Sequence, residues 1–104
     1  MHRLGFKMKL HAGQAATYKH RHDELWQELE QVLKDATVSD YSIFLDEETN
    51  ILFGTLKVAN LEKFNQIPHH PITKRWWAYM ADIMETNPDN SPVSIDLKDV
   101  FYLA

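Results

Sequence analysis

Alternating apolar and polar side chains predict two strands of a hairpin and a separate strand near the start of the chain. Within residues 4–10 every second side chain is apolar and the others are Gly or Lys, which is the period of a strand with one buried face. The ranges 38–45 and 51–58 are predicted strands as well, joined as a hairpin by the polar turn 46–50. Gly54 inside the returning strand predicts a bulge or a close approach by another group.

A periodicity of about 3.6 residues predicts a long helix after the first strand. Residues 15–35 are mostly good helix formers and contain neither Pro nor Gly. The residues just before them offer no Ser, Thr, Asp or Asn as an N-cap. One sector of the helical wheel, roughly 120° wide, gathers the apolar side chains together with one imidazole. Its members are Tyr18, His22, Leu25, Trp26, Leu29, Val32 and Leu33.

The second half of the chain predicts a short helix, another long helix and a last strand. The short helix covers residues 61–67 and ends before a proline. The long helix that follows has Trp76 inside its apolar sector and Trp77 at the rim of that sector. A polar, proline-containing loop at 87–92 cannot be helix or central strand, and residues 100–103 are the last predicted strand.

The order strand, helix, strand, strand, helix, strand predicts a ferredoxin-like βαββαβ fold of the α+β class, with both helices on one face of an antiparallel sheet. The strand 51–58 is apolar on both faces, since Ile51 and Phe53 alternate with Leu52 and Leu56. Helices can cover only one of those faces. We therefore expect the other face to meet the sheet of an identical subunit, giving a homodimer.

Composition narrows the class of protein. A chain of 104 residues predicts one domain, residues 1–104, and a net charge of -4 makes a general nucleic-acid binder unexpected. There is no cysteine, which excludes disulfides, thiolate catalysis and cysteine metal sites and favours a cytoplasmic location. No apolar run reaches membrane-spanning length and the start of the chain has no signal-peptide core, so we expect no membrane partner.

His22 needs an explanation, because it lies on the apolar face of an otherwise well-segregated helix. One interpretation is a core histidine satisfied by a carbonyl or hydroxyl group. The other is a polar pocket shielded by the helix, in which His22 titrates near neutrality. Tyr18 one turn before it and Trp26 one turn after it could then flank the imidazole. Such a site fits a small polar ligand with an apolar face, and the residues leave both interpretations open.

Neither a metal nor a cofactor is expected. His20 and His22 are two positions apart, so on a helix they point away from each other and cannot chelate together. His69 and His70 precede a proline in a loop, where we expect them to be solvated. No phosphate-binding glycine loop, nucleophile elbow or dinucleotide fingerprint is present.

The adjacent pair Trp76 and Trp77 is a second candidate for chemistry. Neighbouring helical indoles point roughly 100° apart and cannot share one packing site. One can pack in the core while the other forms a wall, and an indole face suits the C–H-rich face of a sugar ring. Core packing of both indoles is the alternative.

Several motifs that carry these residues run through the whole chain. They are Tyr18, Arg21-His22 and Trp26, then Tyr41, Arg75-Trp76-Trp77 with Tyr79-Met80, the loop 87–92, and Val100-Phe101-Tyr102-Leu103. Together they closely resemble the L-rhamnose mutarotase family. The resemblance implies a dimeric α/β barrel and an isomerase that interconverts the α and β anomers of L-rhamnose. It also implies His22 as the general acid, with Tyr18, Tyr41, Trp76 and Trp77 contacting the sugar.

The implied reaction agrees with the residues at hand. Mutarotation opens a hemiacetal by removing the proton of the anomeric hydroxyl and protonating the ring oxygen, and it requires no redox step, phosphate or metal. The base could be Tyr18, a water molecule, or His22 in its neutral form. Two other functions stay open: a dimeric α/β-barrel monooxygenase or haem-handling protein, in which a helix histidine faces a cofactor, and a non-enzymatic sugar-binding module.

Overall fold

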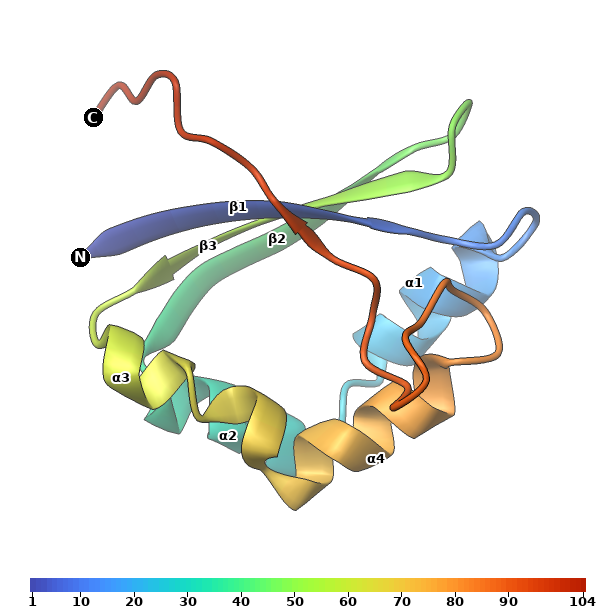
Figure 1. Cartoon of the computed structure of the whole chain (residues 1–104), viewed down its shortest axis with the longest axis horizontal. Coiled ribbons are helices and arrows are strands. Elements are labelled where there is room, and N and C mark those ends of the chain that lie inside the picture. Colours follow the sequence, from blue (N-terminus) through green and yellow to red (C-terminus); the bar gives the residue numbers. More distant parts are fainter.

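A computed structural model describes residues 1–104 and arranges them as a sheet packed on a layer of helices (Figure 1). The strands are β1 (His2–Lys9), β2 (Val38–Asp46), β3 (Ile51–Val58) and β4 (Ile95–Asp96). Their spatial order is β2-β3-β1-β4, and every neighbouring pair is antiparallel. This is the order of the ferredoxin-like plan, so the predicted fold class is confirmed.

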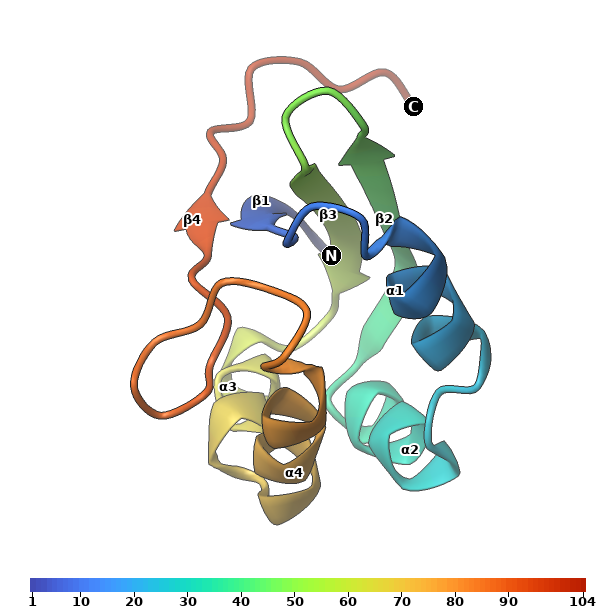
Figure 2. The same cartoon turned by 90° about the vertical axis from the view of Figure 1, so that its right-hand side faces the viewer.

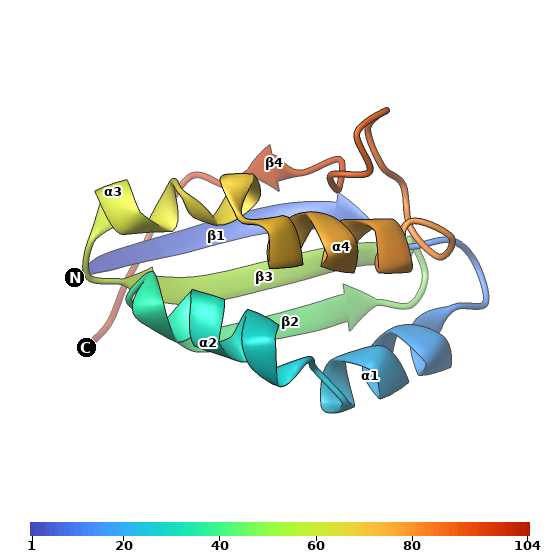
Figure 3. The ribbon, with the colours of Figure 1, turned by 90° about the horizontal axis from the view of Figure 1, so that it is seen from below.

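All the helices lie on the same face of the sheet, as Figure 2 and Figure 3 show from two further directions. They are α1 (Ala15–Asp23), α2 (Gln27–Asp35), α3 (Leu61–Phe64), the 3₁₀ turn η1 (Ile67–His69) and α4 (Pro71–Met80). The first short helix is thus shorter than predicted, because the chain continues into a turn that accommodates a proline near its start. None of the helices is long and apolar enough to cross a membrane.

The core lies between the sheet and the helices. Leu10, Leu52 and Val58 are almost entirely removed from solvent, and burying such a side chain contributes roughly 1.5–3 kcal/mol each. Gly54 faces the same side, where a Cβ atom would overlap the ring of Phe6. The predicted close approach at this glycine is confirmed, and it lets the Phe6 ring lie flat against β3.

The single helix predicted over residues 15–35 is wrong, because the chain breaks it into α1 and α2 at residues 24–26. The N–H of Leu25 bonds the carbonyl of His22 at 3.1 Å, which tightens the last turn of α1. Trp26 then adopts an extended backbone, with φ -58 and ψ 130. No Pro or Gly marks the break. Leu25 and Trp26 turn inward to pack on the core, and this tertiary contact outweighs helix propensity.

The last strand is also misplaced in the prediction, since β4 lies at Ile95–Asp96 and residues 100–103 are outside the sheet. β4 pairs with β1 through Lys7 and Ile95, and the N–H of Leu97 bonds the Gly5 carbonyl at 2.8 Å. Beyond this point the chain leaves the edge of β1. The apolar run 100–103 has the composition of a strand but no neighbouring strand within the chain, and its side chains are exposed.

The face of the sheet away from the helices is open and apolar. Phe44 and Phe53 are cross-strand partners on this face and are 66% and 36% exposed. Ile95 and Leu97 extend the same surface and are 54% and 40% exposed. The prediction that β3 is apolar on both sides is therefore confirmed, and one of those sides has no cover in the single chain.

Candidate active site

Helix α1 presents Tyr18 and His22 to the interior of the fold. Their rings stack at a centroid distance of 4.2 Å and an interplanar angle of 25°, as expected for residues one turn apart. Tyr18 is buried and His22 half-buried. His20 is exposed on the other side of the helix, where its Nε2 lies 3.6 Å from Glu24. The predicted opposite orientations of the two histidines are confirmed.

The hydrogen bond of His22 sets its tautomer. Nδ1 lies 3.0 Å from the carbonyl oxygen of Tyr18, and because a carbonyl only accepts, the network assigns the hydrogen of the neutral ring to Nδ1. Nε2 is then the atom free to gain a proton. Burial lowers the pKa of His22 below its ordinary 6.5, against the opposing effects of the Tyr18 carbonyl and Asp23. His22 is accordingly neutral at pH 7 and can accept a proton.

Helix α4 brings Trp76 against the imidazole. The helix begins at Pro71, and the Nδ1 atom of His70 caps it by accepting the Ile72 N–H at 3.1 Å. The Trp76 indole is buried and perpendicular to the His22 ring, with centroids 5.3 Å apart. Trp26, predicted to flank His22, instead contacts Trp76 at 5.1 Å because of the helix break. The imidazole therefore lies between a phenol and the indole of α4.

Tyr41 lies at a β-bulge in β2 and points to the same space. Asp40 and Tyr41 together oppose the single residue Leu56 of β3. Asp40 has a positive φ of 47, and its carboxylate pairs with Lys57 at 2.8 Å. Tyr41 keeps the alternation of Ile43 and Leu45, so its ring meets Phe6 on the helix-covered face, edge to face at 6.1 Å. The bulge shifts the alternation of the residues before it, so Ser39 and Ser42, three positions apart, both pair on the open face.

Both phenols stay protonated near neutral pH. Burial raises the pKa of Tyr18, and the nearby Tyr41 raises it further. Burial likewise raises the pKa of Tyr41 to about 12, although the residue as a whole is 41% exposed. Each phenol can donate a hydrogen bond to a sugar oxygen, and neither is suited to act as a phenolate base. Tyr18 is thereby removed from the three candidate bases.

Trp77 lies apart from this group. It is half-buried and borders a surface cavity of about 540 Å³, whose other lining residues are Pro68, His69, Lys74, Asp89 and Ser91. A larger cavity, about 590 Å³, lies beside β1 and β4 and does not include His22. Of the five predicted site residues, Tyr18, His22, Tyr41 and Trp76 thus share the space between helices and sheet, and Trp77 is directed elsewhere on α4.

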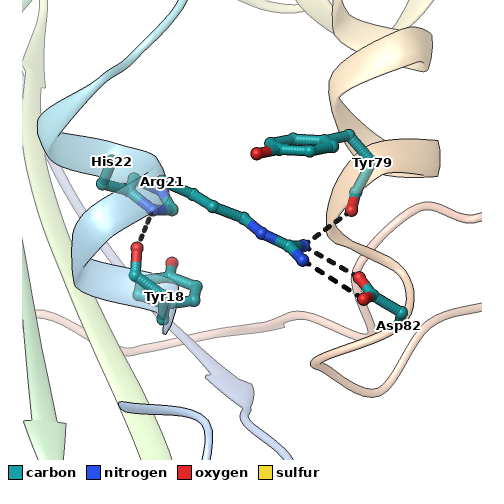
Figure 4. A network of polar contacts seen from close by, with 5 residues as sticks. All are labelled: Tyr18, Arg21, His22, Tyr79 and Asp82. Carbon is teal, nitrogen blue, oxygen red and sulfur yellow. Dashed lines mark hydrogen bonds and ion pairs between the residues drawn. The ribbon is translucent and has the colours of Figure 1, made fainter. Parts of the chain in front are cut away.

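An ion pair that the sequence did not predict joins α1 to the end of α4 (Figure 4). Arg21 Nη1 and Nη2 donate to the two carboxylate oxygens of Asp82 at 2.8 and 3.2 Å. Nη1 also donates to the Tyr79 carbonyl at 2.8 Å, and the guanidinium lies 4.5 Å from the centre of the Tyr79 ring. The partners are about 60 residues apart in sequence, so no local spacing could predict the contact.

No cluster of three or more His, Asp or Glu side chains has an arrangement that could hold a metal ion. His70 accepts a backbone hydrogen bond as the cap of α4. The two histidines of α1 point to opposite sides of that helix. The candidate site is therefore made of aromatic rings, two phenol hydroxyls and one imidazole.

Comparison with known proteins assigns the whole chain to one group. The profile of the L-rhamnose mutarotase family matches residues 3–103. L-Rhamnose mutarotase from Formosa agariphila is 58% identical over 103 residues, covering 99% of each chain. The same-named protein of Rhizobium meliloti is 53% identical over 99% of each chain. A crystal structure of L-rhamnose mutarotase from Formosa agariphila superposes with a TM-score of 0.94 at 57% identity and covers 100% of both chains.

Proposed function

The chain belongs to the L-rhamnose mutarotase family, and we propose that it interconverts the α and β anomers of L-rhamnose, with His22 moving the proton. One observation carries the assignment to this residue. The imidazole is bonded through Nδ1 to the Tyr18 carbonyl and lies between the rings of Tyr18 and Trp76. The ring has its one hydrogen bond within the chain at Nδ1, so Nε2 is available to a sugar hydroxyl.

The reaction needs one proton to move between two oxygens on the same carbon. Nε2 of neutral His22 takes the proton of the anomeric hydroxyl while the bond from C1 to the ring oxygen breaks, leaving an aldehyde. The imidazolium then acts as the general acid and gives the same proton to the ring oxygen. Rotation about C1–C2 and the reverse steps close the ring on the other face. Acid–base catalysis of this kind contributes typically 10²–10⁴-fold.

The other predicted residues hold the sugar. The hydroxyls of Tyr18 and Tyr41, both kept protonated by burial, donate to sugar oxygens. The indole of Trp76 packs on the C–H face of the ring, and its apolar surroundings suit the 6-methyl group. A contact of Trp77 with the sugar rests on the family resemblance alone, because Trp77 borders a separate cavity. The low pKa of His22 supports its neutral form as the base of the first step.

We propose further that the chain is a single domain that works as a homodimer, two copies forming an α/β barrel through their open sheet faces. Support comes from the exposed Phe44, Phe53, Ile95 and Leu97 on that face. Two sheets that pack face to face at about 10 Å would bury these side chains. The exposed apolar run 100–103 leaves the sheet next to the same surface and adds area for a partner.

Saturation-transfer NMR between the anomeric protons of L-rhamnose tests the activity. Adding the protein should increase the exchange rate well above the spontaneous rate at the same pH and buffer concentration. Binding seen by tryptophan fluorescence without faster exchange would make the protein a sugar-binding module. A coloured protein that does not act on L-rhamnose would favour the monooxygenase or haem-handling alternative, which the comparisons do not support.

A further inference from the structure

Helix α1 carries both Tyr18 and His22 but has little apolar packing of its own. Tyr18 is the one buried residue among its nine. The helix starts without a side-chain N-cap and ends at the break of residues 24–26. The position of His22 relative to the rest of the site must therefore depend on contacts other than a buried helix face.

Arg21 supplies the most extensive of those contacts. It lies next to His22 in the chain, and its side chain is only 15% exposed. Its guanidinium makes two bonds to the Asp82 carboxylate and one to the Tyr79 carbonyl, and it stacks on the Tyr79 ring. Paired N–H donors on a carboxylate fix direction as well as distance. The hydrogen bonds from Arg21, together with its charge, lower the pKa of Asp82, so the pair stays ionised at neutral pH.

This contact ties the two elements that form the candidate site. Arg21 belongs to α1, whereas Tyr79 is in the last turn of α4 and Asp82 follows that helix. Trp76, which packs perpendicular to the His22 ring, is one turn before Tyr79 on α4. The separation of α1 and α4 sets the distance between the imidazole and this indole.

We propose that Arg21, held by Asp82 and the Tyr79 carbonyl, is a positioning residue that fixes His22 against Trp76. The inference rests on the proposed role of His22. Arg21 touches neither the sugar nor the reacting atoms. It keeps α1 at the distance from α4 at which Nε2 of His22 meets both oxygens on C1. A displacement of about 1 Å at a reacting group can reduce the rate by roughly 10²-fold.

The same helix offers a matched control. Lys19 and Asp23 pair at 3.0 Å, but both residues lie within α1 and their side chains are 77% and 60% exposed. That pair cannot fix α1 relative to another element, and exposed pairs of this kind contribute little to stability. Removing it should affect neither the site nor the fold.

The experiment compares Arg21→Met, Arg21→Lys and Asp82→Asn with Lys19→Met in the full-length protein. Each variant is measured for kcat and KM of L-rhamnose exchange, for its thermal unfolding midpoint, and for the NMR shift of the His22 ring protons, which the Trp76 ring influences. We expect kcat to fall about 10- to 100-fold in Arg21→Met. Asp82→Asn should lose less, and Arg21→Lys an intermediate amount because Lys cannot reproduce the bidentate geometry.

In these variants KM should change by no more than about 3-fold and the midpoint by no more than about 5 °C. The His22 shifts should move in step with kcat, and Lys19→Met should match the wild type in every measurement. The double variant Arg21→Met with Asp82→Asn should lose no more kcat than Arg21→Met alone, since both changes remove the same contact.

Wild-type kcat and His22 shifts in folded Arg21→Met and Asp82→Asn would overturn the proposal. Loss of kcat with unchanged His22 shifts would also contradict it. Failure of the proposed catalytic role looks different: His22→Gln would then exchange anomers at the wild-type rate, while the His22 shifts in Arg21→Met would still report whether Arg21 positions the ring. If Arg21→Met does not fold, Arg21→Lys and Asp82→Asn decide between the outcomes.

Discussion

The two faces of the sheet differ in the side chains that they carry and in how far these are covered. On the helix-covered face, Tyr18, His22 and Tyr41 lie among buried apolar side chains such as Leu52. On the open face, Phe44 and its neighbours are exposed with no element over them. The covered face thus carries polar groups that a single chain shields, and the open face carries apolar groups that a single chain cannot shield.

We therefore expect the covered face to carry the reaction and the open face to form the contact between subunits. Buried polar groups with shifted pKa values are costly and gather at functional sites, whereas contiguous exposed apolar surface marks contact with another protein. Substitutions on the covered face should therefore change the reaction and leave the mass of the particle unchanged. Substitutions on the open face should instead lower the mass of the particle, because they separate the subunits.

The largest effect is expected at His22. His22→Gln removes the proton-transfer group while keeping a polar side chain, so anomer exchange should fall on the order of 10²-fold or more in a folded, sugar-binding protein. His20→Gln is the control, because His20 lies on the exposed side of the same helix, and it should keep the wild-type rate. Saturation-transfer NMR and thermal unfolding measure both. Equal losses in the two variants would contradict the assignment of α1 faces.

The open face is tested by mass. Phe44→Glu places a charge on the apolar surface, which should convert a dimer of 12.2 kDa chains into monomers at micromolar concentration. Glu48→Lys, in the turn between β2 and β3 and off that surface, also changes charge and should leave the mass unchanged. Light scattering measures the mass of both variants and of His22→Gln, which should keep the mass of the wild type. A wild-type protein that is already monomeric would refute the proposed dimer.

Substitution of the two indoles of α4 should have effects of intermediate size on KM, and the two effects should differ. Trp76 packs on His22 and Trp26, so Trp76→Phe should raise KM about 10-fold, near the upper range of an aromatic pair. Trp77 borders another cavity, and Trp77→Phe should raise KM by about 3-fold or less. Exchange kinetics measure KM, and fluorescence titration with L-rhamnose measures the affinity of each variant. The reverse order would place the sugar on the Trp77 side of α4.

The pH dependence is the smallest effect, because His22 is already neutral at pH 7. If neutral His22 takes the first proton, kcat/KM should be flat above the lowered pKa and decrease as the pH falls through it, after subtraction of the spontaneous rate. The free energy of unfolding should depend on pH in the same direction. The unfolded histidine, with a pKa near 6.5, binds more protons than the folded one, so unfolding free energy is lost as the pH drops through this window. A rate that rises on acidification would contradict the scheme.

Much of this architecture could be predicted, because it depends on local pattern. The hairpin 38–46 and 51–58, the glycine that Phe6 approaches, and the opposite orientations of His20 and His22 all follow from periods of 2 and 3.6 residues. The break between α1 and α2 did not follow, because it comes from packing of Leu25 and Trp26 on the core without any Pro or Gly.

The features that complete the candidate site depend on long-range geometry. The bulge at Asp40 and Tyr41 places one extra residue in β2, which no residue type signals. The contact of Arg21 with Asp82 joins helices far apart in sequence. The apolar run 100–103 was predicted as a strand because composition cannot tell whether a neighbouring strand is present.

The proposed reaction requires one neutral imidazole, that of His22, anchored through Nδ1 and ready to receive a proton at Nε2. Long-range ¹⁵N–¹H NMR of the histidine side chains, titrated over pH with and without L-rhamnose, tests it directly. For His22 we expect the Nδ1–H tautomer, a pKa below 6.5, and a change in the Nε2 signal when the sugar is added. The Nε2 signal of His20 should not change on adding the sugar. A His22 that is the Nε2–H tautomer, or that stays protonated at pH 7, would contradict it.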